Sequence, residues 1–193
     1  MRKKIILLAV LFLFVGLNTN CSADSKKVLM VIPNNGFRDE EFKIPFAALK
    51  QEGFEVVVAS SALSPAKGML GLSVEPDILL TTARAFDYDA IIFVGGIGAQ
   101  EFWDDINAHE LAKNMHRDDK IVSAICIAPV ILANAGILDG KEATVWSSES
   151  HRLESKGARY TGKPVEIDGN IITADGPQSS EEFVQAIIKK LGD

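Results

Sequence analysis

Four short, continuous apolar runs rich in β-branched residues constrain the fold of this chain most. They are KVLMVIP at residues 27–33, FEVVVAS at 54–60, DAIIFVGG at 89–96 and KIVSAIC at 120–126. Runs that are apolar at nearly every position are typical of strands buried on both faces, as in parallel sheets between layers of helices. Helix signals lie between these runs, so the alternation predicts an α/β fold with a mostly parallel sheet.

Helix and turn signals complete this pattern. Apolar residues recur at helical spacing over residues 42–49, and Gly53 follows as a stop signal. Near the C-terminus, Ser179 and Glu182 predict a capping box ahead of an amphipathic helix that Gly192 ends. Residues 165–174 predict a hairpin that turns on Asp-Gly-Asn.

The N-terminal segment, residues 1–23, is a separate unit. Three basic residues at positions 2–4 precede an apolar run that is shorter than the ~20 residues of a membrane span. This pattern predicts a secretory signal rather than an uncleaved anchor. Cleavage is expected either before a lipidated Cys21, as in bacterial lipoproteins, or after Ala23. Residues 27–193 are then a single exported domain, periplasmic or held in the bacterial envelope by its lipid.

Charge and cysteine count exclude some partners. The formal net charge is −6, and loss of the three basic residues with the signal makes it −9. No other cluster of lysine or arginine follows, so we expect no nucleic-acid partner. Contact with a membrane is expected only through a lipid on Cys21. Cys126 then has no internal partner, and no structural disulfide is expected.

Cys126 lies at the carboxyl end of the fourth apolar run, where doubly wound sheets bind their ligands. Pro129 suits the first turn of a helix, so the thiol is expected at a sharp strand-to-helix turn, a nucleophile elbow. Unpaired N–H groups at such a turn predict a lowered thiol pKa. The alternative is a cysteine that only packs, as buried free cysteines often do.

Two further segments supply candidate partners for this thiol. Gly95 and Gly96 directly follow another predicted strand, where their amides can approach a ligand closely. On the helical projection Glu41 lies about 90° from the apolar face, at the margin of the core, whereas Glu40 points to solvent. A partly desolvated Glu41 stays protonated or acts as a base. Alternatively, the acidic run 39–41 only favours a helix N-terminus.

The chain resembles the ThiJ/PfpI superfamily, which includes the human Parkinson-disease deglycase, through EEFKIP at 40–45, GGIGAQ at 95–100, AICIAPVILANAG at 124–136 and DGNIITADGP at 168–177. The similarity runs from about residue 27 to the C-terminus. It implies a flavodoxin-like three-layer sandwich of the class I glutamine amidotransferase type, a homodimer and no cofactor. It also implies that Cys126 is the reactive cysteine beside Glu41, and that the amides of Gly96 and Ile127 form an oxyanion-hole-like pair.

Two positions depart from the pattern of this superfamily. Peptidase-like members carry a histidine directly after the cysteine, where this chain has Ile127, which disfavours a peptidase or amidase. Deglycase-like members carry a histidine after the next strand, where this chain has Trp146, a candidate wall of the site. His151 is a candidate base, although a solvated helix-start histidine is the simpler interpretation. His109 and His116 are expected at the surface of a polar helix, and no metal site is expected.

Three hypotheses follow for function. The first is a cofactor-free glyoxalase or deglycase in which Cys126 attacks a small reactive carbonyl or a modified protein side chain, and Glu41 moves protons. The second is a redox sensor or stress-protective protein, in which Cys126 is oxidised to a sulfinic acid that Glu41 stabilises. The third is a binding module that keeps the fold without its chemistry, with Trp146 lining an apolar pocket.

Overall fold

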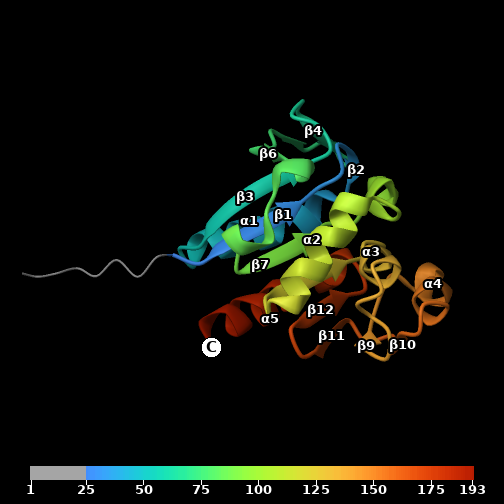
Figure 1. The fold of residues 1–193 in the computed structure, drawn as a ribbon. Helices are drawn as coiled ribbons and strands as arrows, with labels where there is room; N and C mark the ends of the chain where they lie inside the picture. Colours follow the sequence, from blue (N-terminus) through green and yellow to red (C-terminus); the bar gives the residue numbers. More distant parts are fainter. Residues whose placement is uncertain (1–24) are drawn as a thin grey trace, which may run out of the picture.

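A seven-stranded sheet forms the centre of the computed structural model, which describes residues 25–193 (Figure 1). The predicted signal segment and Cys21 lie outside the described residues. The strands of this sheet are β1 (Lys27–Val31), β3 (Glu55–Ser60), β6 (Ile78–Leu79), β7 (Ala90–Phe93), β8 (Ile121–Ile125), β11 (Val165–Asp168) and β12 (Ile171–Ala174). Within residues 25–193, no helix is long and apolar enough to cross a membrane.

The order of the strands is β11-β12-β8-β7-β1-β3-β6, and only the β11–β12 pair is antiparallel. The five strands from β3 to β12 follow the order of a flavodoxin-like sheet. The four predicted runs are β1, β3, β7 and β8, and every residue of β7 and β8 is buried. The expected α/β fold with a mostly parallel sheet is therefore confirmed.

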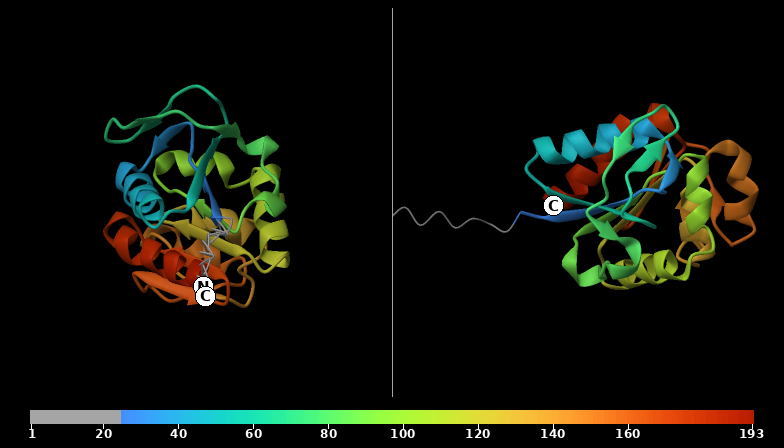
Figure 2. Two further views of the ribbon diagram at one scale, coloured as in Figure 1. Left: turned by 90° about the vertical axis from the view of Figure 1, so that its left-hand side faces the viewer. Right: turned by 90° about the horizontal axis from the view of Figure 1, so that it is seen from above.

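Helices cover both faces of the sheet (Figure 2). Helices α1 (Asp39–Gln51) and α5 (Ser180–Gly192) lie side by side on one face, and α2 (Ile106–Arg117) and α3 (Pro129–Asn134) cover the other. Alternate residues of β1 join the two cores, so Val28 and Met30 pack with α1 and α5 while Leu29 and Val31 pack on the opposite side. This two-sided burial explains why the strand sequence is continuously apolar.

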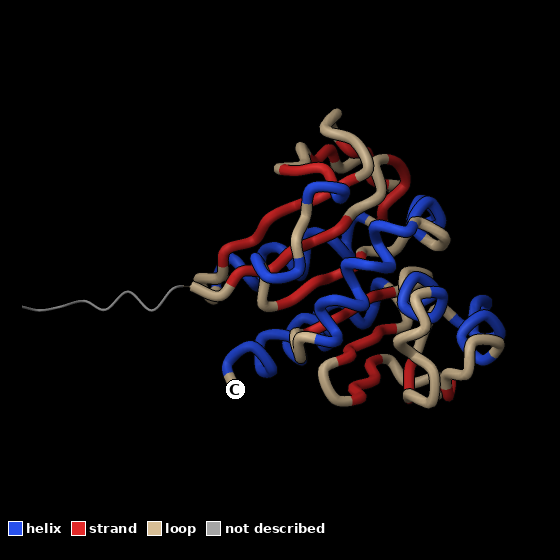
Figure 3. The backbone as a smooth tube through the Cα atoms, viewed as in Figure 1, coloured by secondary structure: helices blue, strands red, loops and turns tan. Residues whose placement is uncertain are grey.

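Shorter elements lie around this sandwich (Figure 3). A small sheet consists of β2 (Asn35–Phe37), β4 (Ala66–Gly68) and β5 (Ser73–Val74), and a second one pairs β9 (Glu142–Ala143) with β10 (Arg159–Tyr160). Helix α4 spans Ser150–Glu154. The 3₁₀ helices are η1 (Leu80–Thr82), η2 (Ala85–Asp87), η3 (Ile97–Phe102), η4 (Ser147–Glu149) and η5 (Pro177–Ser179).

The C-terminal segment confirms one local prediction and corrects another. Strands β11 and β12 form the expected hairpin, and Gly169 takes the positive φ of 63° that its two-residue turn requires. The capping box is wrong, because the Ser179 hydroxyl hydrogen-bonds the Asp175 carboxylate at 2.5 Å and leaves α5 without a side-chain cap. The helix also continues through Gly192.

Candidate active site

Cys126 occupies a strained turn directly after β8. Its φ is 63°, in the left-handed region that residues other than glycine rarely adopt. Two backbone hydrogen bonds hold it there: its N–H donates to the Ala174 carbonyl at 2.9 Å, and its carbonyl accepts from the Trp146 N–H at 2.8 Å. Pro129 begins α3 three residues later. The sharp strand-to-helix elbow at the carboxyl edge of the sheet is present as predicted.

Glu41, in the first turn of α1, is completely buried beside this cysteine. The Gly95 N–H donates to its Oε2 at 3.1 Å, while Oε1 is buried without a well-aligned partner. Burial raises the pKa of Glu41 to about 8, against the opposing hydrogen bonds from Cys126 and Gly95. The carboxyl is therefore mostly protonated at neutral pH. The helical projection predicts Glu41 at the margin of the core, but the structure buries it fully. A projection of one helix does not include the loop at Gly95, which covers the Glu41 side chain.

The predicted lowering of the thiol pKa is wrong. Burial raises the pKa of Cys126 to about 12, and the charge of Glu41 adds to this effect. The amides of Gly96 and Ile127 hydrogen-bond the thiol and act in the opposite direction, but they do not outweigh burial and Glu41. Cys126 and Glu41 interact directly, and the Glu41 carboxyl loses its proton before the thiol does.

Gly95 is the residue that lets the acid and the thiol meet. A Cβ atom here would lie 2.5 Å from Glu41 Oε2, 2.6 Å from Cys126 Cβ and 2.7 Å from the Ile125 carbonyl oxygen. Its carbonyl accepts from the Arg38 N–H at 3.0 Å, which ties the start of α1 to this loop. Backbone and carboxyl can approach the elbow only because this side chain is absent.

The pocket above Cys126 has a volume of about 360 Å³. Its lining includes five of the predicted site residues: Glu41, Gly96, Cys126, Ile127 and Trp146. The remaining lining residues are Arg38, Met69, Ile97, Gln100, Ser148, Glu149, Pro177 and Gln178. Sequence reasoning missed these eight, because most of them are brought to the elbow by contacts between segments far apart in the chain.

None of the three histidines, all within the described residues, lines this pocket. His151 is exposed on α4. His109 and His116 are half-buried on α2, and Nε2 of His109 lies 2.8 Å from the Trp103 carbonyl oxygen. Helix α2 buries one apolar face, and the two histidines, which were expected at the surface of a polar helix, are only partly exposed on it. Glu41 is thus the titratable neighbour of the thiol in this pocket.

Asp39 fixes one wall of the pocket. Its carboxylate accepts hydrogen bonds from the N–H groups of Leu70 and Leu72 at 2.8 and 2.7 Å, which pins the connection between β4 and β5 onto the start of α1. That connection carries Met69 into the pocket lining. Glu40, expected in solvent, is half-buried and forms an ion pair with Arg38, with Nε and Oε2 2.9 Å apart. The acidic run therefore does more than favour a helix N-terminus.

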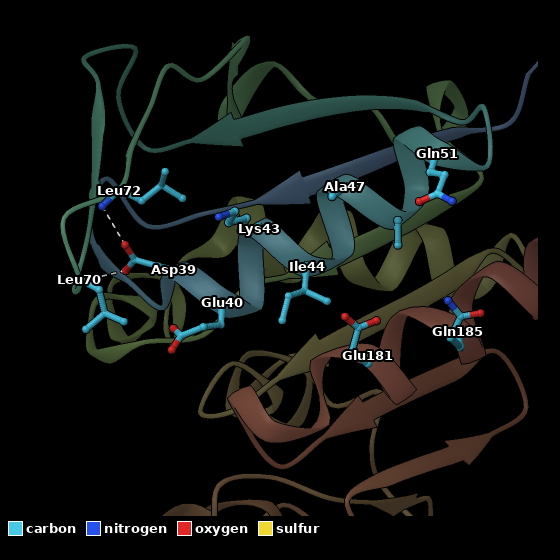
Figure 4. A pocket seen from close by; sticks show the side chains of 11 residues that line it. Asp39, Glu40, Lys43, Ile44, Ala47, Gln51, Leu70, Leu72, Glu181 and Gln185 are labelled. Atoms are coloured by element: carbon cyan, nitrogen blue, oxygen red, sulfur yellow. Dashed lines mark hydrogen bonds between the residues drawn. The ribbon is translucent and has the colours of Figure 1, made fainter.

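A larger groove of about 740 Å³ lies between α1 and α5 (Figure 4). Its walls include Ile44, Ala47, Leu70 and Leu72, and polar side chains such as Lys43 and Glu181 lie around them. It contains no cysteine and no histidine. Among residues 25–193, no group of three or more His, Cys, Asp or Glu side chains is arranged to hold a metal ion. The pocket at Cys126 is therefore the candidate active site.

A cysteine at a strained elbow, faced by two backbone amides and a buried acid on a flavodoxin-like sheet, defines a protein of the class I glutamine amidotransferase-like fold. The chain belongs to the DJ-1/PfpI family, whose model matches residues 26–190. The expected membership in the ThiJ/PfpI superfamily is confirmed.

Three known proteins match the chain over most of their own length. It is 40% identical to an uncharacterized protein of Methanocaldococcus jannaschii over 168 residues, which are 86% of this chain and 82% of that protein. It is 28% identical to Deglycase PfpI of Pyrococcus furiosus, covering 84% of this chain and 98% of that protein. The crystal structure of a ThiJ/PfpI domain protein from Brachyspira murdochii matches with a TM-score of 0.85 and 34% identity, over 87% and 97% of the two chains.

Proposed function

We propose that this protein is a cofactor-free, cysteine-dependent enzyme of the glyoxalase or deglycase type that acts on reactive carbonyls. The observation that carries the proposal is the direct contact of the Cys126 thiol with a buried Glu41 and the amides of Gly96 and Ile127. The similarity to Deglycase PfpI supports the same class of reaction. The pocket of about 360 Å³ suits a small molecule or one modified side chain.

With a 2-oxoaldehyde as substrate, the Cys126 sulfur bonds to the aldehyde carbon, and the thiol proton passes through Glu41 to the carbonyl oxygen. The amides of Gly96 and Ile127 stabilise the negative charge that develops on that oxygen before the proton reaches it. Glu41 then moves the hydrogen of this carbon to the neighbouring carbonyl carbon as a proton, and the hydroxyl proton of the first carbon passes to the oxygen of the second. The first carbon is thereby oxidised to a thioester and the second reduced to an alcohol. Water hydrolyses the resulting thioester, which releases a 2-hydroxy acid and restores the thiol.

Because Glu41 acts as a base only when ionised, kcat/KM is expected to rise as the pH increases through about 8. The decisive experiment measures lactate formed from methylglyoxal by the wild-type chain and by Cys126→Ala and Glu41→Gln. Loss of at least ~100-fold in both variants is expected, in line with general acid–base contributions. Equal rates in the wild-type chain and Cys126→Ala contradict the proposal.

One observation favours a second function, a redox sensor that protects against oxidative stress. Oε1 of Glu41 is buried without a well-aligned partner beside the thiol, so a protonated Glu41 can donate a hydrogen bond to a sulfinate oxygen on Cys126. Mass spectrometry after treatment with peroxide is expected to find two added oxygens on Cys126, and fewer in Glu41→Leu, whose side chain has no hydrogen-bond donor. Oxidation that does not depend on Glu41 argues against this function.

We also propose that the protein is exported, on the strength of the basic and apolar N-terminal pattern in its sequence. Fractionation of cells that express the full chain tests this directly. A product bound to the envelope that Cys21→Ala releases indicates lipidation, whereas release in both forms indicates ordinary cleavage. Retention of the full-length chain in the cytoplasm contradicts export.

A further inference from the structure

We propose that the pocket prefers 2-oxoaldehydes with an apolar aromatic substituent, and that Trp146 is the residue that sets this preference. The inference rests on the proposed function, since it names the substrate class of the same site. It concerns the outer part of the pocket, which the reaction steps at Cys126 do not use.

Three exposed apolar side chains from separate segments line the mouth of this pocket. Met69 is 47% exposed, Ile97 is 65% exposed and Trp146 is 44% exposed, and all three belong to the pocket lining. A single exposed apolar side chain is ordinary on a protein surface. Three that converge on one nucleophile are not, and exposed apolar surface of this kind marks a place where a ligand binds. The pocket therefore has a polar reacting end and an apolar mouth.

The backbone holds Trp146 next to the nucleophile. Its N–H donates to the Cys126 carbonyl at 2.8 Å, so the two residues are joined directly. Its ring packs against Gly176, where a Cβ atom would lie 2.9 Å from ring carbons Cε3 and Cζ3. The indole is thus supported from behind by backbone and still partly open to the pocket. Such a surface favours the stacked or edge-to-face approach of another aromatic ring.

The charged groups at the mouth are already paired. Arg38 makes two contacts with Glu40, at 2.9 and 3.1 Å, and Glu149 lies 2.7 Å from Nε of Arg152. The charges of Arg38 and Glu149 are thus each partly compensated by a neighbouring side chain. This arrangement favours an uncharged substituent on the dicarbonyl over a carboxylate.

The test compares initial rates with phenylglyoxal, which becomes mandelate by addition of water and internal redox, and with methylglyoxal, which becomes lactate. Wild-type protein is expected to favour phenylglyoxal in kcat/KM, and Trp146→Ala to lose about tenfold of that preference. Tenfold corresponds to about 1.4 kcal/mol, within the range of one aromatic contact. Trp146→Phe is expected to retain most of it.

Two further measurements separate specificity from folding. Phe86→Ala removes another exposed aromatic side chain, which lies before β7 at the opposite end of the sheet, and is expected to change neither rate. Gly176→Ala pushes on the indole without removing it, and is expected to reduce the preference. In Cys126→Ala, mandelate is expected to change the tryptophan fluorescence at lower concentration than lactate, and this difference is expected to be lost when Trp146→Phe is added.

The outcomes distinguish the two proposals. Turnover that depends on Cys126 but shows no preference for phenylglyoxal, or a preference that survives Trp146→Ala, overturns this inference and leaves the proposed function standing. If Cys126 contributes nothing to turnover of either compound, the proposed function fails and the inference fails with it. A preference lost equally in Phe86→Ala assigns the effect to stability and also overturns the role of Trp146.

Discussion

Replacement of Glu41 by glutamine is expected to stabilise the protein in a way that depends on pH. The pKa of Glu41 is about 8 in the folded chain against an ordinary value of 4.5, because the carboxyl is buried. Between these two values the folded chain holds a proton that the unfolded chain has released. The free energy of unfolding of the wild-type chain therefore falls as the pH rises through this window.

The size of the effect follows from the same two values. They are about 3.5 pH units apart, and at about 1.4 kcal/mol per unit the loss approaches about 5 kcal/mol once the pH exceeds 8. Glutamine stays neutral at every pH and keeps an oxygen that can accept from the Gly95 N–H. Glu41→Gln is thus expected to match the wild-type chain within about 1 kcal/mol near pH 5 and to be more stable by several kcal/mol near pH 8.5.

Urea unfolding of both chains across this range measures the difference in their free energies of unfolding. Titrating groups that are the same in both chains cancel in this difference. The thiol of Cys126, whose ordinary pKa is 9.0, stays mostly protonated below about pH 8 in both the folded and the unfolded chain, so it adds little slope there. Glu40→Gln is the matched control, because this neighbouring acid is half-buried and paired with Arg38. Parallel curves for Glu41→Gln and the wild-type chain between pH 5 and 8.5 would refute a buried, protonated Glu41.

Three further predictions concern the same region. In Glu41→Gln, which lacks the Glu41 charge, the pKa of Cys126 is expected to fall below about 12. Alkylation by iodoacetamide above pH 8 is then expected to speed up about tenfold for each unit by which the thiol pKa falls; an unchanged rate profile counts against the contact. Gly95→Ala is expected to cost about 2–3 kcal/mol in urea unfolding, since its Cβ overlaps Glu41 and Cys126; a loss below about 0.5 kcal/mol contradicts the overlap. Asp39→Ala is expected to free residues 68–72, measured as faster amide hydrogen exchange there and as about 2 kcal/mol of lost stability; unchanged exchange contradicts the tether.

The sheet could be predicted because burial on both faces requires an apolar side chain at nearly every position of a strand. Strands β7 and β8 are buried throughout, and their sequences are correspondingly continuous apolar runs. Strands β4 and β5 have three and two residues, too few for any periodicity, and nothing local marks them. The position of Cys126 followed from the end of one run and the proline after it.

The electrostatics of the site could not be predicted in the same way, because they depend on contacts between distant segments. The sequence of the elbow suggests unpaired amides that favour a thiolate, but the larger effect is burial against Glu41, 85 positions earlier in the chain. The position of Met69 in the pocket wall depends on two hydrogen bonds from backbone N–H groups to Asp39. Hydrophobic pattern and residue propensity do not predict such contacts between distant segments. Ser179 was expected to cap a helix, but Asp175 competes for its hydroxyl.

The left-handed backbone conformation at Cys126 lowers the stability of the fold for a residue that has a side chain. For an L-residue, a φ of 63° costs roughly 1–2 kcal/mol that glycine does not incur. Backbone strain alone would therefore favour glycine at position 126. Cysteine at this place stands against that preference, and stabilising substitutions found by screening for thermal resistance alone are expected to include Cys126→Gly.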